Sequence, residues 1–166
     1  MKLKKLDFFA LALMCATSYS AAAFAPASTP DDVTSREIRG LFKSQDEANW
    51  NGETPEQLAR RFYTEDVVIV GEGETSTQRG MKDAVSALVN WNEYLGPGGN
   101  KLCHFEVLEP VITSGDMASA FVTLSCKPNP PKTTKPESIR QLFVLRRTPQ
   151  GWRVAQEMWE NGGMDH

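Results

Sequence analysis

Three segments in the first half of the chain carry apolar residues at the spacing of an amphipathic helix. The first spans residues 34–51, beginning at a Thr-Ser pair that suits an N-cap and ending at an Asn-Gly pair. The second starts at Thr54-Pro55, and the third spans residues 81–94 and ends before a Gly-Pro-Gly-Gly stretch. Their apolar faces are formed by Ile38, Leu41, Phe42, Ala48, Leu58, Phe62, Tyr63, Ala84, Val85, Leu88 and Trp91.

Strand patterns dominate the second half of the chain. One β-branched run, at residues 67–70, predicts an early strand between the second and third helices. Residues 102–113 and 117–126 predict a hairpin, and residues 139–147 and 152–159 predict another. Helices that are segregated to one face of an antiparallel sheet define an α+β domain, which is the fold class that we expect.

The N-terminal residues 1–25 have the pattern of a secretory signal peptide. Three lysines precede an apolar run over residues 8–16, and the segment ends in Ala23-Phe24-Ala25, which predicts cleavage after Ala25. The run is too short for a transmembrane helix, which needs about 20 residues. Lipoprotein processing at Cys15 is the alternative, although Ala12-Leu13-Met14 lacks the small residues that a lipobox has just before its cysteine. We therefore expect a periplasmic or secreted bacterial protein.

The composition fits a single globular domain. The chain has 166 residues, 40% of them hydrophobic, and a net charge of −3. A mildly acidic chain lacks the clustered Lys and Arg that bind a phosphate backbone, so we expect no nucleic acid partner. We expect a tether at residues 26–32, one domain at 33–162 and a tail at 163–166, with no membrane span after removal of the signal peptide.

Cys103 and Cys126 lie on the two strands of the first predicted hairpin. If the turn is formed by Ser114-Gly115, opposed residues have numbers that sum to 229, and the two cysteines face each other. Directly opposed residues are close enough for a disulfide, and an oxidising compartment permits one. A single bulge would break this register, so a disulfide and two free thiols both remain open at this point.

Four short motifs follow one another along the predicted domain: Trp50-Asn51-Gly52, the segment 62–70, Arg79-Gly80-Met81, and Gly151-Trp152-Arg153-Val154 with Trp159. Their order and spacing resemble the nuclear transport factor 2-like superfamily, specifically its SnoaL-like and ketosteroid-isomerase-like bacterial branch. The resemblance covers residues 33–162. It implies a cone-shaped domain, with a strongly bent antiparallel sheet on three helices, a conical pocket and often a homodimer. It does not imply a reaction, because this fold hosts many functions.

The isomerase residues of that branch can be located in this sequence. In similar isomerases a carboxylate late in the first strand takes the proton, while a tyrosine and a protonated acid stabilise the enolate. The base falls at Gly71, the tyrosine near Gln45 and the acid at Phe143, so all three positions depart from the pattern. We therefore expect a pocket that lacks the proton-handling groups of this branch, unless a one-residue bulge turns Glu72 inward.

Aromatic side chains are the main material that the sequence offers for the pocket, although aromatics at this spacing are also common in cores. The resemblance implies that Trp159 borders the cavity. A mostly apolar cavity with a few polar groups is the usual form of a small-molecule site. We expect the pocket to be lined by Gln45, Trp50, Tyr63, Trp91, Phe121, Phe143, Gln156, Met158 and Trp159.

Two further expectations concern the outside of the cone. If Phe121 points inward, the small apolar residues that alternate with it in the strand 117–124 face outward, which suits a homodimer formed through the sheet. We expect the arginines of the last two strands to be solvated and paired with Glu157 and Glu160. The alternative is that these arginines bind a carboxylate ligand.

Two classes of function remain open. The first is an exported binding or accessory protein that holds a small apolar or aromatic ligand. The second is a SnoaL-like isomerase, dehydratase or cyclase that uses Glu72, His104 or Glu106 as its acid or base, although His104 and Glu106 also suit a half-exposed strand. A scaffold whose cone is filled by side chains is a third possibility. No phosphate loop or H-E-x-x-H motif occurs, so we expect no cofactor and no metal.

Overall fold

The computed structural model of the protein describes residues 33–130 and 137–162. The predicted signal peptide (1–25), tether (26–32) and tail (163–166) lie outside the described residues. Among the residues that are described, no helix is both long and apolar enough to cross a membrane.

Three helices precede most of the sheet, as the apolar periodicity predicts. They are α1 (Val33–Trp50), α2 (Pro55–Phe62) and α3 (Gly80–Leu95). Thr54 caps α2 through a capping box, in which its hydroxyl accepts from the Gln57 amide and the Gln57 side chain accepts from the Thr54 amide. A short 3-10 turn, η1 (Gly99–Leu102), leads from α3 into the sheet.

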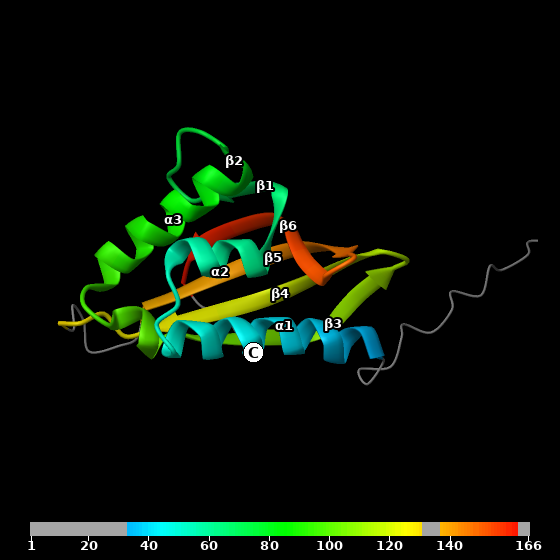
Figure 1. The fold of residues 1–166 in the computed structure, drawn as a ribbon, viewed down its shortest axis with the longest axis horizontal. Coiled ribbons are helices and arrows are strands. Elements are labelled where there is room, and N and C mark those ends of the chain that lie inside the picture. Colours follow the sequence, from blue (N-terminus) through cyan, green and yellow to red (C-terminus); the bar gives the residue numbers. More distant parts are fainter. Residues whose placement is uncertain (1–32, 131–136, 163–166) are drawn as a thin grey trace, which may run out of the picture.

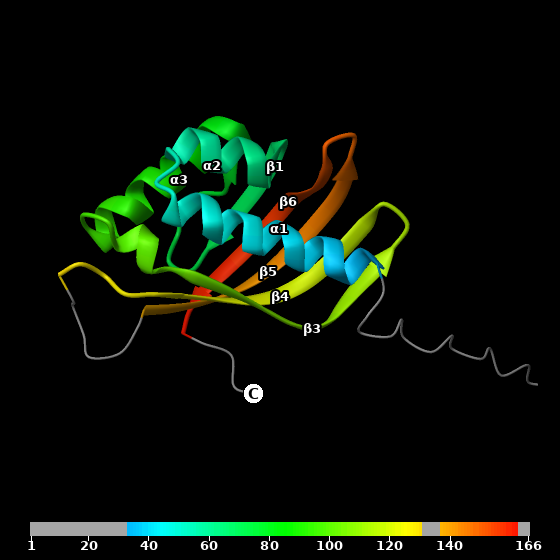
Figure 2. The ribbon, with the colours of Figure 1, turned by 60° about the horizontal axis from the view of Figure 1, so that its bottom comes forward.

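The sheet has six strands in the order β2-β1-β6-β5-β4-β3. Strands β3 to β6 form an antiparallel meander, β2 is antiparallel to β1, and β1 runs parallel to β6, so the sheet is mixed rather than wholly antiparallel. Figures 1 and 2 show the sheet curving around the three helices, which all lie on one side of it. The strands are β1 (Tyr63–Gly71), β2 (Gln78–Arg79), β3 (His104–Ser114), β4 (Met117–Cys126), β5 (Glu137–Thr148) and β6 (Gly151–Asn161).

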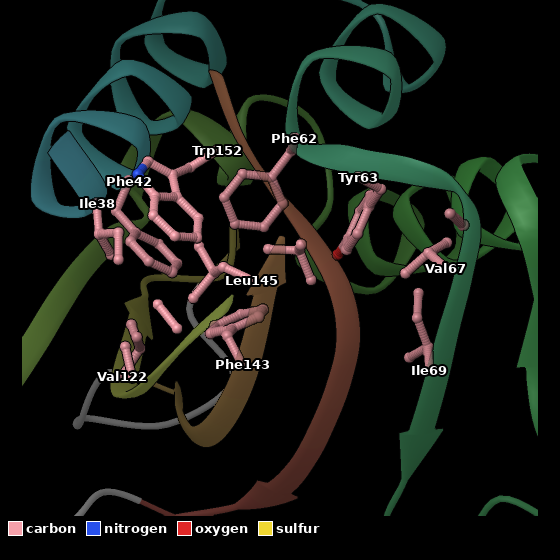
Figure 3. Close-up of a cluster of buried hydrophobic side chains, with 14 of the residues drawn as sticks. Ile38, Phe42, Phe62, Tyr63, Val67, Ile69, Val122, Phe143, Leu145 and Trp152 are labelled. Atoms are coloured by element: carbon pink, nitrogen blue, oxygen red, sulfur yellow. The ribbon is translucent and has the colours of Figure 1, made fainter. Parts of the chain in front are cut away.

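An aromatic core joins the helices to the concave face of the sheet. The ring of Phe42 in α1 lies 5.4 Å from that of Phe62 in α2 and 5.1 Å from that of Phe143 in β5. Figure 3 shows these side chains packed with Val122, Leu145 and other buried residues. Phe143 is fully buried in this cluster, so its predicted place in the pocket is wrong. Close contacts of this kind stabilise the fold by area burial and ring–ring geometry together.

The hairpin of β3 and β4 turns at Gly115-Asp116, one residue later than predicted. Near this turn Ile112 pairs with Ser119, so paired residues have numbers that add up to 231. Beyond an irregularity between Leu108 and Ile112, Leu108 pairs with Phe121, and the numbers of paired residues add up to 229. Two extra residues of β3 in this stretch therefore bring Cys103 opposite Cys126. The structure joins these two cysteines in a disulfide, which ties the start of β3 to the end of β4.

A bulge in β6 changes which residues face the helices. Leu145 pairs with Val154, whereas Val144 pairs with Gln156, so Ala155 is an extra residue in β6. Trp152 and Val154 are buried before the bulge, and Glu157 is buried after it. One extra residue shifts the alternation by one position, because successive strand residues point to opposite faces.

Candidate functional site

A cavity of about 450 Å³ opens between α3 and the strands β1, β5 and β6. This volume lies within the usual range for small-molecule sites. The face of α3 that is turned toward the sheet forms one wall of the cavity. The residues of β6 that follow its bulge form the opposite wall. The lining residues are Tyr63, Ile69, Glu74, Gln78, Ala87, Leu88, Asn90, Trp91, Tyr94, Glu137, Ser138, Ile139, Gln141, Glu157, Trp159 and Asn161.

Glu157 is a buried carboxyl group in the wall of this cavity, with only 7% of its surface exposed. The Tyr63 hydroxyl donates a hydrogen bond to its Oε2 at 2.6 Å, and Gln141 Nε2 donates to its Oε1 at 2.8 Å. Tyr63 is the first residue of β1, and Gln141 lies beside β6 in β5, so both partners come from strands that flank Glu157.

Burial controls the protonation of this group. Removal from water raises the pKa of Glu157, and the hydrogen bonds from Tyr63 and Gln141 offset only part of that rise. Burial also raises the pKa of Tyr63 well above its usual value, and the adjacent Glu157 charge raises it further. A carboxyl group with a raised pKa that lines a cavity is chemically suited to donate a proton to a bound molecule or to accept one from it.

Aromatic rings form much of the remaining wall. The rings of Trp91 and Tyr94 in α3 are stacked, with centroids 5.3 Å apart and an interplanar angle of 16°. The indole of Trp159 lies against Gly71, where an added Cβ would be 2.2 Å from the ring carbons. The position that carries the base in similar isomerases is therefore packed under Trp159, and no larger residue fits there without moving this ring.

Three of the nine predicted lining residues surround the cavity: Tyr63, Trp91 and Trp159. Gln45 is buried away from it, where Nε2 donates to the Leu58 carbonyl at 3.5 Å. Trp50 is half exposed at the end of α1, and its indole N–H donates to the Cys103 carbonyl.

The other predicted lining residues lie in the core or on the outer face of the sheet. Phe143 belongs to the core, as described above. Phe121 is 52% exposed and Met158 57% exposed, and both line a groove on the outer face, while Gln156 is exposed as well. The predicted inward positions of Phe121, Gln156 and Met158 are therefore wrong. For Gln156 and Met158 the reason is the bulge at Ala155, which reverses the faces of β6.

The three predicted acid–base residues all lie outside the cavity. Glu72 is exposed and accepts from the backbone and side-chain amides of Asn161, both at 2.8 Å, which continues the pairing of β1 with β6. Glu106 is exposed on β3. His104 is exposed too, and its Nδ1 lies 3.1 Å from Oδ2 of Asp46.

Asp46 joins α1 to β3 and is a structural carboxylate. It accepts hydrogen bonds from the Phe105 backbone amide at 3.2 and 3.1 Å, in addition to its contact with His104. Burial raises the pKa of Asp46, while the Phe105 amide and His104 lower it. Its partners are a backbone amide and an exposed side chain, and it does not line the cavity.

Most lining residues were not predicted from the sequence, and Glu157 and Gln141 are the two that form the buried hydrogen-bonded group at the wall. Glu157 was expected to be a solvated partner of an arginine, but Arg140 pairs with Glu160, at 2.7 Å. The sequence nevertheless contained a pattern that points to Glu157. Trp159 was expected to border the cavity, and residues two apart in a strand share a face. The same rule applied to Trp159 identifies Glu157. The expectation that the cavity lacks a proton-handling group is therefore wrong.

The outer face of the sheet also differs from the prediction. Ala118, Ala120 and Val122 are buried on the concave side, and Phe121 points outward. The two faces of β4 are thus exchanged relative to the prediction. The small residues point inward, where their size leaves room for Phe42 and Phe143 in the core. The outer groove has a volume of about 510 Å³ and is lined by Val70, Gly71, Glu72, Phe121, Arg140, Gln141, Leu142, Met158, Trp159 and Glu160.

The described residues contain no group of three or more His, Cys, Asp or Glu side chains that is arranged to hold a metal ion.

No protein-family model matches the sequence, and no curated protein matches it either.

Solved bacterial structures share the fold. A ketosteroid isomerase-like protein from Erwinia carotovora atroseptica is 20% identical, with a TM-score of 0.59 and 78% of this chain and 96% of that chain covered. An NTF2-like protein from Novosphingobium aromaticivorans is 21% identical, with a TM-score of 0.56 and coverage of 82% and 94%. An NTF2-like protein of unknown function from Pseudomonas putida is 21% identical, with a TM-score of 0.59 and coverage of 78% and 87%.

The chain therefore has the nuclear transport factor 2-like fold, and the predicted α+β fold class is confirmed. The same fold serves many functions, so function has to be argued from the cavity and its side chains.

Proposed function

We propose that this protein binds a small molecule in the cavity between α3 and the sheet, with Glu157 as the polar anchor. The observation that carries the proposal is a buried carboxyl group, held by Tyr63 and Gln141, in the wall of a cavity that is also lined by aromatic, aliphatic and amide side chains and by two further glutamates. Buried ionisable groups lower stability unless they are compensated, and they concentrate at functional sites. A cavity with apolar walls and a few placed polar or charged groups is a common form of ligand site.

A second candidate function is acid–base catalysis by Glu157. The raised pKa of this buried carboxyl favours it, because a general acid or base works best when its pKa lies near the operating pH. Glu157 then takes the role that the sequence suggested for Glu72, His104 or Glu106. Exchange of ligand hydrogen for solvent deuterium, catalysed by the wild-type protein and lost in Glu157→Gln, separates an enzyme from a binding protein.

The place of action proposed for this chain is the periplasm or the extracellular space. The signal-peptide pattern of residues 1–25 supports export, and the Cys103–Cys126 disulfide is typical of proteins in oxidising compartments. N-terminal sequencing of the protein recovered from a periplasmic extract tests this proposal, since cleavage after Ala25 leaves Pro26 as the first residue.

Filling the cavity is expected to weaken the binding of an apolar probe. N-phenyl-1-naphthylamine, a neutral dye that fluoresces in apolar surroundings, should bind the wild-type protein. Ala87→Phe places a ring into the cavity from α3 and should weaken dye binding by about tenfold or more, because the dye loses contact area that is worth roughly 25 cal/mol per Å². A fluorescence titration measures both affinities.

Val89→Phe is the matched control for this experiment. Val89 lies on the same helix and is exposed, and it does not line the cavity, so the same ring is added outside the site. Unchanged dye binding in Ala87→Phe, with both variants folded, would place the dye elsewhere and contradict the proposed site.

The predicted homodimer through the sheet remains a prediction, and different residues would form it. Phe121, Leu142, Met158 and Val70 share the outer groove, and exposed apolar patches of this kind commonly mark interfaces. Phe121→Glu is expected to shift a dimer to monomer in light scattering coupled to size exclusion, with the fold retained because residue 121 is exposed. A wild-type monomer, or a variant that remains dimeric, would contradict this prediction.

A further inference from the structure

We infer that the ligand of this cavity is an organic cation, an amine that carries an apolar or aromatic body. This inference rests on the proposed function, because it specifies the chemical class of the molecule that the cavity takes. Three properties of the lining support it: the charged side chains are acidic, two buried amide oxygens have no donor among the described residues, and aromatic rings line the same cavity.

The charged side chains of the cavity are all acidic. Glu74, Glu137 and Glu157 line it, and no Lys, Arg or His occurs among the described residues of the lining. None of these three glutamates forms an ion pair with another described residue. The arginines of the neighbouring strands are engaged elsewhere, since Arg140 pairs with Glu160 and Arg146 pairs with Asp66. Among the described residues, the carboxyl groups of the lining therefore favour a positively charged ligand over an anion.

Two buried amide oxygens of the lining, on Gln78 and Gln141, have no hydrogen-bond donor among the described residues. The Gln141 side chain is 93% buried, and its amide nitrogen is oriented by donation to Glu157 Oε1 at 2.8 Å. Its amide oxygen consequently points elsewhere and finds no partner among the described residues, and the same holds for the Gln78 amide oxygen. A buried acceptor without a partner destabilises a protein, so a ligand that brings N–H donors to these oxygens gains affinity.

The aromatic rings complete a site that suits an ammonium group. Trp91 and Tyr94 are stacked on α3, and Trp159 lies across the cavity on β6. A cation within about 6 Å of an aromatic face is attracted by the negative potential of the ring, most strongly for Trp and for desolvated sites. An apolar ligand body contacts the same rings, so one molecule can use the charge, the acceptors and the aromatic surface together.

Three probes of nearly the same shape separate charge from size. They are 1-naphthylmethylamine, which is cationic at neutral pH, 1-naphthalenemethanol, which is neutral, and 1-naphthoic acid, which is anionic. Their affinities for the purified wild-type protein can be measured by quenching of tryptophan fluorescence or by calorimetry. We expect the amine to bind about tenfold or more tightly than the alcohol, and the acid to bind most weakly, since a charge-assisted hydrogen bond is stronger than a neutral one.

Glu157→Gln tests the source of the preference. The variant should bind the amine no more tightly than the alcohol, while its affinity for the alcohol stays within about twofold, because the substitution removes the charge and keeps the size of the side chain. Glu106→Gln is the matched control, since it removes one negative charge from an exposed position of β3 that does not line the cavity. Its probe affinities should equal those of the wild type.

The possible outcomes distinguish this inference from the proposed function. Equal affinity for the amine and the alcohol, or a preference for the acid, would overturn the inference and leave a small-molecule site in place. Failure of all three probes and of the neutral dye to bind would overturn both. The ranking of the three probes by the wild-type protein decides the question even if Glu157→Gln does not fold.

Discussion

Glu157→Gln is expected to make the folded protein more stable at neutral and alkaline pH, although it removes the anchor of the site. The carboxyl is buried, and burial raises its pKa above the ordinary value of 4.5. A glutamine has the same shape and no charge, and it can accept from Gln141 and donate to the Tyr63 hydroxyl. We expect a gain of about 1–2 kcal/mol in the free energy of unfolding at pH 8, within the range of typical stabilising substitutions.

The sign of the pH dependence follows from the direction of the pKa shift. Below pH 4.5 the carboxyl is protonated in both the folded and the unfolded chain, so it gives the wild type no disadvantage. As the pH rises toward the raised pKa of the folded state, the unfolded chain releases its proton first and the folded state is progressively disfavoured. The advantage of Glu157→Gln should therefore grow with pH and level off above the folded-state pKa.

Tyr63→Phe should have the opposite effect. The Tyr63 hydroxyl donates to Glu157 and lowers its pKa, so removing it leaves a buried carboxylate oxygen without that donor. We expect a loss of about 1–3 kcal/mol at neutral pH and a further rise in the pKa of Glu157.

Denaturant unfolding of the wild type and both variants between pH 4 and 9 measures these effects, and an NMR titration of the glutamate carboxyl carbons reports the pKa of Glu157 itself. If Glu157→Gln were less stable than the wild type at pH 8, the two hydrogen bonds would outweigh the desolvation of the charge. The assignment of Glu157 as a residue kept for function at the expense of stability would then be wrong.

Loss of the disulfide is expected to have the largest effect on stability. Cys103 and Cys126 are 23 residues apart in the sequence, and a loop of this size gives a disulfide stabilisation of about 3 kcal/mol in the chain-entropy description. Both cysteines are buried with Leu95, Leu124 and Ile139 in a small cluster beside the main core. The variant with Cys103→Ala and Cys126→Ala should unfold at a markedly lower denaturant concentration.

A reducing agent provides the control for this prediction. Dithiothreitol should lower the unfolding midpoint of the wild type toward that of the double alanine variant, and it should leave the midpoint of that variant unchanged. Mass spectrometry of the oxidised wild type should show two free thiols fewer than after reduction. If reduction did not change the wild-type midpoint, the disulfide would make no contribution to stability.

Local patterns predicted most of the elements. The three helices were visible because apolar residues recur every three or four positions and because Pro55 and the glycines after Leu95 mark their ends. The two hairpins were visible from alternating strands around short turns. The parallel pairing of β1 with β6 was not, since the partners are about ninety residues apart and neither strand encodes its neighbour.

The site was only partly predictable for the same reason. Tyr63, Trp91 and Trp159 were identified as lining residues, whereas Phe121, Gln156 and Met158 were placed on the wrong face of the sheet. A strand has a period of two, so a single extra residue at Ala155 exchanges inward and outward positions for the rest of β6. Nothing in the local sequence around Ala155 marks this bulge.

The sequence by itself determined the class of the fold and the order of most of its elements, because these depend on local periodicity and on the chemistry of single residues. Tertiary structure alone decided that Glu157 is buried between Tyr63 and Gln141, that Trp159 covers Gly71, and that the two cysteines meet. Each of these depends on the register between strands that are distant in the chain, and register is set by bulges and by packing of the whole core.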